Sequence, residues 1–183
     1  MAGILVPLAQ GCEELEAVTL VDLFRRAELE VITASLDGQP VRASRGTVLI
    51  ADQALDAVLE HDFDMIALPG GLPGSDHLRD DPRIQQLITR LHDAGKIVAA
   101  ICAAPRALAA AGVLQGRRAT SYPGTLDRMD IPGMTYLEQA VVVDGNVVTS
   151  RGPGTAMDFA LTLIERLAGP ATRQAVEEPL LRP

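Results

Sequence analysis

The stretch Ile97-Val98-Ala99-Ala100-Ile101-Cys102-Ala103-Ala104-Pro105 decides the fold of this chain. Five consecutive apolar residues at 97–101 predict a buried strand, and the alanine-rich residues 103–111 predict a helix that follows at once. A strand that turns into a helix at one residue is the geometry of a nucleophile elbow, in which a sharp turn pushes the side chain outward. The residue at this turn is Cys102.

Short apolar runs alternate with helical patterns along the rest of the chain. Continuous apolar strands separated by helices are typical of a mainly parallel sheet that is covered on both faces. We therefore predict a single α/β domain over residues 1–183. The predicted strands are residues 4–8, 30–35, 65–68, 97–101, 141–143 and 147–150, with a hairpin-like region around 41 and 48–51, and the predicted helices are residues 14–27, 82–94, 103–111 and 155–167.

Composition and charge limit the classes of partner. The chain has 24 Asp and Glu against 16 Lys and Arg, and the net charge of −8 argues against general binding to nucleic acid or to anionic membranes. No run approaches the roughly 18 apolar residues of a membrane span. No basic leader precedes the first strand, so we expect a cytoplasmic protein. Cys12 and Cys102 are too few for a disulfide framework and are expected to be free thiols.

Functional residues of a parallel sheet gather beyond the carboxyl ends of its strands. Residues 9–16, 69–75 and 102–105 are predicted to lie there. Amides at the start of the helix after Cys102 would face the sulfur, favour its anion and lower the thiol pKa from about 8.5. The alternative interpretation is that Cys102 is a small buried hydrophobe.

A carboxylate lies on the apolar face of the first predicted helix. Glu16, Leu20, Leu23, Phe24 and Ala27 follow the spacing i, i+4, i+7, i+8, i+11. Burial and a neighbouring thiolate would both raise the pKa of Glu16. A protonated Glu16 that donates a hydrogen bond to an ionised Cys102 would form a coupled pair. The alternative is that Glu16 belongs to an acidic first turn, favoured by the helix dipole.

The other candidate residues carry weaker signals. The turn at Gly70 and Gly71 lets backbone approach a ligand, and its amides are candidate oxyanion donors. Cys12 is either a second oxidation site or a packing residue. Leu15 and Val18 lie outside the buried stripe of the first helix and suggest a partner surface.

The sequence lacks the motifs of several common kinds of functional site. No histidine is placed beside Cys102 by its spacing, so we do not expect a Cys-His-Asp triad. The chain has no phosphate loop, dinucleotide fingerprint or zinc spacing, and no metal or cofactor is expected.

Four ordered motifs resemble the ThiJ/PfpI superfamily, and within it the branch of the parkinsonism-associated deglycase and its bacterial relatives. The motifs are Gly11-Cys12-Glu13-Glu14-Leu15-Glu16, Leu68-Pro69-Gly70-Gly71, Ala99-Ala100-Ile101-Cys102-Ala103-Ala104-Pro105 and Thr149-Ser150-Arg151-Gly152-Pro153-Gly154-Thr155. The resemblance covers residues 4 to about 169. It implies a flavodoxin-like three-layer sandwich and a homodimer through the first helix.

The resemblance also implies roles for individual residues. It assigns the nucleophile to Cys102 and its protonated partner to Glu16. The oxyanion amides fall on Gly71, beside Gly70, and on Ala103. Arg45 matches a basic residue that reaches the partner subunit's site in relatives.

Two positions depart from branches of the superfamily. Tyr122 stands where the deglycase has a histidine, so a mechanism that needs this histidine is in doubt. Ala103 stands where the protease branch has a histidine, which disfavours peptidase activity.

Two functions remain open on this reasoning. The first is a cofactor-independent glyoxalase or deglycase that protects against methylglyoxal, glyoxal or their adducts. The second is a redox-sensing, chaperone-like protein in which Cys102 is oxidised to sulfinic acid. A binding module with an inert cysteine is the third alternative.

Overall fold

The computed structural model describes residues 3–182, and within them a seven-stranded sheet has the order β10-β11-β7-β6-β1-β2-β5. All neighbouring strands in it are parallel except β10 and β11. The strands are β1 (Gly3–Leu8), β2 (Glu30–Ser35), β5 (Gln53–Ala54), β6 (Met65–Leu68), β7 (Ile97–Ile101), β10 (Val141–Asp144) and β11 (Val147–Ser150). The prediction of a mainly parallel, flavodoxin-like sheet is confirmed.

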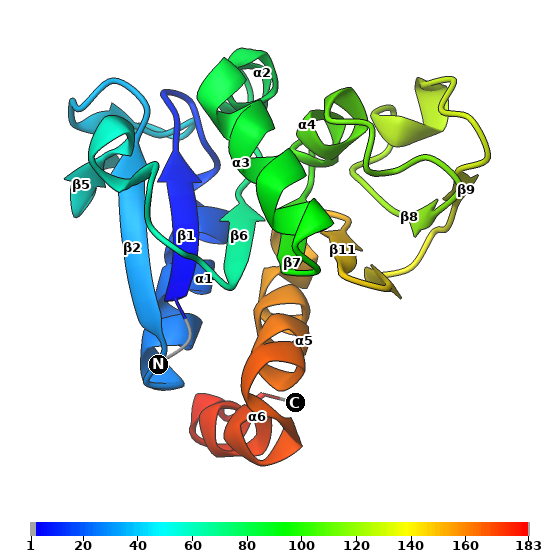
Figure 1. Cartoon of the computed structure of the whole chain (residues 1–183). Helices are drawn as coiled ribbons and strands as arrows, with labels where there is room; N and C mark the ends of the chain where they lie inside the picture. Colours follow the sequence, from blue (N-terminus) through cyan, green and yellow to red (C-terminus); the bar gives the residue numbers. More distant parts are fainter. Residues whose placement is uncertain (1–2, 183) are drawn as a thin grey trace.

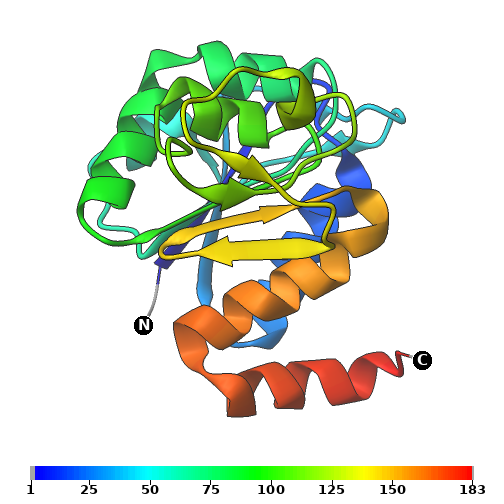
Figure 2. The same cartoon turned by 90° about the vertical axis from the view of Figure 1, so that its right-hand side faces the viewer.

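Helices cover both faces of the sheet, as Figures 1 and 2 show. On one face α1 (Glu14–Arg26), α5 (Ala156–Ala168) and α6 (Pro170–Glu177) pack against one half of the core. On the other face α2 (Gly74–Asp80), α3 (Pro82–Asp93) and α4 (Pro105–Ala110) pack against the other half. Strand residues alternate between the two halves, because successive side chains of a strand point to opposite faces: Ile97, Ala99 and Ile101 to the first, Val98 and Ala100 to the second.

The structure differs from the predicted elements in several places. The helix after Cys102 begins at Pro105 rather than at residue 103, and residues 102–104 form a tight turn before it. The predicted hairpin-like region is a short antiparallel pair, β3 (Val41–Arg42) and β4 (Val48–Leu49). Helices α2 and α6 were not predicted, and neither was the short pair β8 (Arg118–Ala119) and β9 (Thr135–Tyr136). No helix in residues 3–182 is long and apolar enough to cross a membrane.

The strand order brings three loops together at the carboxyl edge of the sheet. Strand β1 lies between β6 and β2, and β7 lies beyond β6, so the loops that follow β1, β6 and β7 are neighbours. The amide of Glu13 donates to the carbonyl of Gly70 at 2.8 Å, and that of Tyr122 donates to the carbonyl of Cys102 at 2.8 Å. These bonds join the segments that carry the candidate site.

Candidate active site

Cys102 has a backbone conformation that a side-chain-bearing residue rarely adopts. Its φ is +64°, in the left-handed region, which costs an L-residue about 1–2 kcal/mol. The surrounding structure compensates: the Cys102 amide donates to Ser150 at 3.0 Å and its carbonyl accepts from Tyr122. Strain of this kind at one residue is a property of functional turns. The predicted elbow is present, and it lies between β7 and the turn before α4.

Gly70 lies directly between Cys102 and Glu16. A methyl group on Gly70 would lie 2.6 Å from Cys102 Cβ, 2.7 Å from Glu16 Oε2 and 3.0 Å from the carbonyl oxygen of Ile101. Only glycine leaves room for the thiol and the carboxyl to approach each other here.

Glu16 is fully buried on the inner face of α1. Its Oε2 accepts a hydrogen bond from the amide of Gly70 at 2.7 Å. Its Oε1 has no partner with regular hydrogen-bond geometry, although the carboxyl does interact with the thiol of Cys102. A buried oxygen without a regular partner is costly unless it carries or shares a proton.

Beside an ionised Glu16, the pKa of the Cys102 thiol is raised to about 12, so the expectation of a net lowering is wrong for the thiol in that state. Burial is the largest cause, and the negative charge of Glu16 is the second. The amides of Gly71 and Ala103 lower the pKa of this thiol, but burial and the charge of Glu16 outweigh them. When Glu16 is ionised the pair is already negative, so ionisation of Cys102 then removes the second proton of the pair.

Burial also raises the pKa of Glu16, to about 7, against the lowering effects of the Gly70 amide and the Cys102 thiol. The direction agrees with the prediction from the helical spacing. Because the charge of Glu16 raises the pKa of Cys102, the pair resists the loss of its second proton.

Cys102 opens into a cavity of about 500 Å³. Three more of the sequence-predicted residues, Gly71, Ala103 and Arg45, line the same cavity. Gly70 and Glu16 lie behind Cys102, away from the opening. The candidate residues are thus brought together in one chain.

Arg45 lies in a turn that Glu14 holds. The amide of Arg45 donates to both carboxylate oxygens of Glu14 at 3.0 Å, and the amide of Thr47 donates to Oε1 at 3.3 Å. Although burial opposes ionisation, bonds from the amides of Glu14 itself, Arg45 and Thr47 lower the pKa of Glu14 to about 2. Arg45 therefore lines the cavity of its own chain, and its reach toward a partner's site stays a prediction.

Tyr122 forms part of the cavity mouth and is half exposed. Its ring also contacts the backbone at Gly152, where an added methyl group would lie 3.3 Å from Cδ2. In residues 3–182, none of the residues that line this cavity is a histidine, and no group of three His, Cys, Asp or Glu side chains is arranged to hold a metal ion.

The sequence reasoning missed Arg106, which lines the cavity from the first turn of α4. Its Nε donates to the carbonyl of Ala103 at 3.1 Å, and its Nη1 donates to Asp76 Oδ1 at 2.7 Å. One signal was present in the sequence: a cation in the first turn of a helix opposes the helix dipole and needs a local reason.

Cys12 lies behind the site and does not line the cavity. It is fully buried, and burial, assisted by the charge of Glu14, raises the pKa of its thiol to about 11. Because Cys12 has no exposed surface and does not line the cavity, the structure favours the packing interpretation of this residue.

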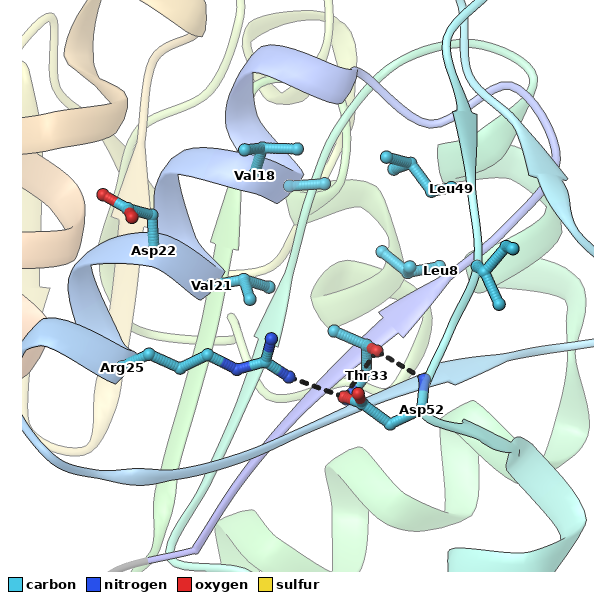
Figure 3. A pocket seen from close by; sticks show the side chains of 10 residues that line it. Leu8, Val18, Val21, Asp22, Arg25, Thr33, Leu49 and Asp52 are labelled. Atoms are coloured by element: carbon cyan, nitrogen blue, oxygen red, sulfur yellow. Dashed lines mark hydrogen bonds and ion pairs between the residues drawn. The ribbon is translucent and has the colours of Figure 1, made fainter.

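A second cavity, of about 290 Å³, lies between α1 and the segment that carries β4 (Figure 3). It shares no lining residue with the cavity at Cys102. Val18 and Val21 of α1 face Leu8 and Leu49 across it. At one end Arg25 pairs with Asp52 at 2.8 Å. This cavity lies next to the exposed residues of the first helix.

Comparison with known proteins gives one consistent answer. The model of the DJ-1/PfpI family matches residues 2–166. Parkinson disease protein 7 homolog of Danio rerio is 42% identical over 186 residues, which cover 99% of this chain and 98% of that protein. Glutathione-independent glyoxalase DJR-1.2 of Caenorhabditis elegans is 37% identical over 179 residues, which cover 98% and 95%.

Solved structures agree with the sequence matches. The crystal structure of DJ-1beta of Drosophila melanogaster superposes with a TM-score of 0.94 at 40% identity, covering 100% of this chain and 98% of that one. Some relatives are longer: the chain spans 46% of the length of Protein DJ-1 homolog A of Arabidopsis thaliana, to which it is 39% identical.

Proposed function

Because the chain belongs to the DJ-1/PfpI family, we propose that it is a cysteine-dependent protective enzyme that converts small 2-oxoaldehydes into 2-hydroxy acids. Methylglyoxal and glyoxal are the simplest substrates of this class. The name of one relative, the glutathione-independent glyoxalase of Caenorhabditis elegans, supports the reaction type. The proposal needs no metal and no cofactor.

The observation that carries the proposal is the unequal bonding of the two Glu16 oxygens. Oε2 is occupied by the Gly70 amide, whereas the buried Oε1 has no regular partner. A carboxylic acid binds a donor through its carbonyl oxygen and carries its proton on the other, so the proton belongs on Oε1. There it can be donated to the sulfur, which the amides of Gly71 and Ala103 also approach. We infer that the single negative charge of the pair rests on Cys102.

The first step is addition of the thiolate to the aldehyde carbon. The Sγ–C1 bond forms, and the C1=O π electrons move to the oxygen. The amides of Gly71 and Ala103 are near enough to the sulfur to donate to this oxyanion. Protonation of the oxyanion gives a hemithioacetal.

The second step is an internal redox isomerisation through Glu16, whose pKa of about 7 suits both proton removal and proton return. Glu16, which has given its own proton to the C1 oxyanion, takes the proton from C1; the electron pair forms a C1=C2 bond, and the C2 oxygen is protonated. A proton is then added to C2 while the C1 hydroxyl loses its proton, which leaves a thioester at C1 and a hydroxyl at C2. C1 is oxidised and C2 is reduced, so no external oxidant takes part. Water then cleaves the C1–S bond and releases the 2-hydroxy acid and the thiolate.

The cavity of about 500 Å³ is much larger than a three-carbon aldehyde. This spare volume supports action on adducts that such aldehydes form with thiols, amines or guanidines, which is the deglycase form of the same chemistry. Both forms begin with attack by Cys102, and they differ in whether the aldehyde arrives free.

The test is methylglyoxal consumption and lactate formation by wild type, Cys102→Ala and Cys12→Ala. Loss of turnover in Cys102→Ala, with retention in Cys12→Ala, is expected, because Cys12 is buried outside the cavity. Turnover in D₂O adds a test of the proton step, since solvent deuterium is expected at C2 of lactate. Unchanged turnover in Cys102→Ala would refute the proposal.

The second candidate function is redox sensing, and the same accessible sulfur favours it. Cys102 lines an open cavity, unlike Cys12. A thiolate reacts with one peroxide to give sulfenate and water, and sulfenate reacts with a second to give sulfinate and water. The Oε1 proton of Glu16 would then bind a sulfinate oxygen in a charge-assisted hydrogen bond. Gain of two oxygens without aldehyde turnover would select this function and the chaperone-like role attached to it.

We also propose that the chain forms a homodimer through α1. Leu15 and Val18 are 50% and 49% exposed on this helix, and the exposed Ile50 lines the same cavity as Val18. Exposed large apolar side chains grouped in this way mark interaction surfaces. The family resemblance favours a second copy of the chain as the partner.

A further inference from the structure

Arg106 forms the only side-chain hydrogen bond to the turn after Cys102 among the residues that the structure describes. The backbone of this turn is otherwise held by the Ser150 carbonyl, by the Tyr122 amide and by bonds within the turn itself. Arg106 Nε donates to the carbonyl of Ala103 at 3.1 Å, whereas the Arg106 amide reaches the same oxygen only at 3.4 Å. The side chain therefore supplies the shorter of the two bonds.

The guanidinium is itself held from α2. Asp76 Oδ1 accepts from Arg106 Nη1 at 2.7 Å and from Arg79 Nη1 at 2.9 Å. The Arg106 side chain is 20% exposed, so its bonds are partly screened from water. Asp76 on α2 thus holds Arg106 on α4, and Arg106 in turn holds the carbonyl of Ala103.

We propose that Arg106, oriented by Asp76, is a positioning residue that fixes the Ala103 turn and so aims the Ala103 amide at the sulfur of Cys102. The reason is the strain at the elbow: a left-handed Cys102 relaxes unless the residues on both sides are held. On one side the Ser150 carbonyl holds the Cys102 amide, and on the other Arg106 holds Ala103. Arg106 does not need to touch the substrate for this role.

The test is the rate at which iodoacetamide alkylates Cys102 as a function of pH, followed by mass spectrometry. It rests on the proposed function only in taking Cys102 as the reactive group, and it needs no aldehyde. The charged groups around the sulfur are Glu16 behind it and Glu13, Arg45 and Arg106 along the cavity. These charges also affect the alkylation rate, so each variant is compared with wild type over the same pH range.

In Arg106→Met, the alkylation rate at pH 7 is expected to fall about fivefold, because one amide bond to the thiolate is weakened. The pH at which the alkylation rate begins to rise is expected to be higher than in wild type. Asp76→Ala, a change at a partly exposed position, is expected to act in the same direction. The double variant is expected to be no slower than Arg106→Met, since both changes break one connection.

The matched control is Arg79→Met, which removes the other arginine on Asp76 and leaves the Arg106 bonds in place. Its pH profile is expected to equal that of wild type. The proposal is overturned if Arg106→Met and Asp76→Ala keep the wild-type profile, or if Arg79→Met shifts it equally. It is also overturned if Arg106→Met raises KM for methylglyoxal alone, because that result assigns Arg106 to substrate binding. If wild type consumed no aldehyde but the alkylation shifts were observed, positioning would stand and only the proposed function would fail.

Discussion

The carboxyl of Glu16 and the thiol of Cys102 face each other across Gly70, at the single point where a glycine leaves space for both. A methyl group on Gly70 would contact Cys102 Cβ at 2.6 Å and Glu16 Oε2 at 2.7 Å, and the same glycine donates its amide to Oε2. The pair is thus set by the backbone of one residue. In the proposed function, the proton shared by this pair allows one buried site to hold a nucleophile and an acid together.

Gly70→Ala tests this arrangement. The added methyl group meets the carbonyl oxygen of Ile101 as well as the pair, and backbone there cannot move freely. We expect a loss of roughly 1–3 kcal/mol in the free energy of unfolding, measured by urea titration, and loss of aldehyde turnover. Gly154→Ala is the control, because nothing lies within 4 Å of its added methyl group. Equal stability and turnover in both variants would contradict the packing described for Gly70.

The stability of the protein should depend on pH through Glu16. The folded pair of Glu16 and Cys102 gives up its first proton at the raised pKa of about 7, whereas Glu16 of the unfolded chain does so at 4.5, so the folded state holds this proton more tightly. The resulting stabilisation is complete below pH 4.5 and is lost as the pH rises through 7. Relative to Glu16→Gln, the wild type is expected to lose roughly 3 kcal/mol of unfolding free energy over this window. A difference between the two proteins that does not vary with pH would argue against a buried carboxyl.

The predicted dimer depends on the apolar surface of α1. Val18→Asp places a charge on a side chain that is 49% exposed and lines the cavity of Figure 3. We expect a shift from dimer to monomer in size-exclusion chromatography with light scattering, with the fold retained. Met129→Asp, at another exposed apolar position, is expected to leave the mass unchanged. If the wild type itself is a monomer, the prediction of a dimer is wrong.

The two cysteines should react differently with mild peroxide. Cys102 lines a cavity and Cys12 is fully buried, so peptide mass spectrometry is expected to find two added oxygens on Cys102 and to find Cys12 at least roughly tenfold less modified. Equal oxidation of both residues would mean that the loop around Cys12 opens readily.

Much of this arrangement could be predicted from the sequence, because local pattern and topology agree. The apolar run at 97–101 fixed the strand before Cys102, and the helical spacing of Glu16 with Leu20 and Phe24 correctly placed a carboxyl on the buried face of α1. The parallel sheet then required the loops to meet at one edge.

The parts that sequence reasoning missed depend on long-range contacts. Helix α2 has seven residues and follows a glycine-rich turn, which gives it little helical signal. The side chain of Arg106 is held by Asp76, which lies thirty positions earlier on that unpredicted helix. The direction of the Cys102 pKa was also wrong, because no sequence pattern shows how far burial and a neighbouring charge outweigh two amides.

The central claim is that the one negative charge of the pair rests on sulfur while Glu16 keeps its proton. It is tested most directly by the thiolate absorbance of Cys102 against pH, in a Cys12→Ala background, with Glu16 or Glu16→Gln. The account predicts that the thiolate forms in the first ionisation of the pair, below the usual range of a free thiol, and that its midpoint rises by about one unit in Glu16→Gln, because an amide is a weaker donor than the acid. A midpoint near pH 12 that decreases in Glu16→Gln would place the charge on the carboxylate and contradict the account.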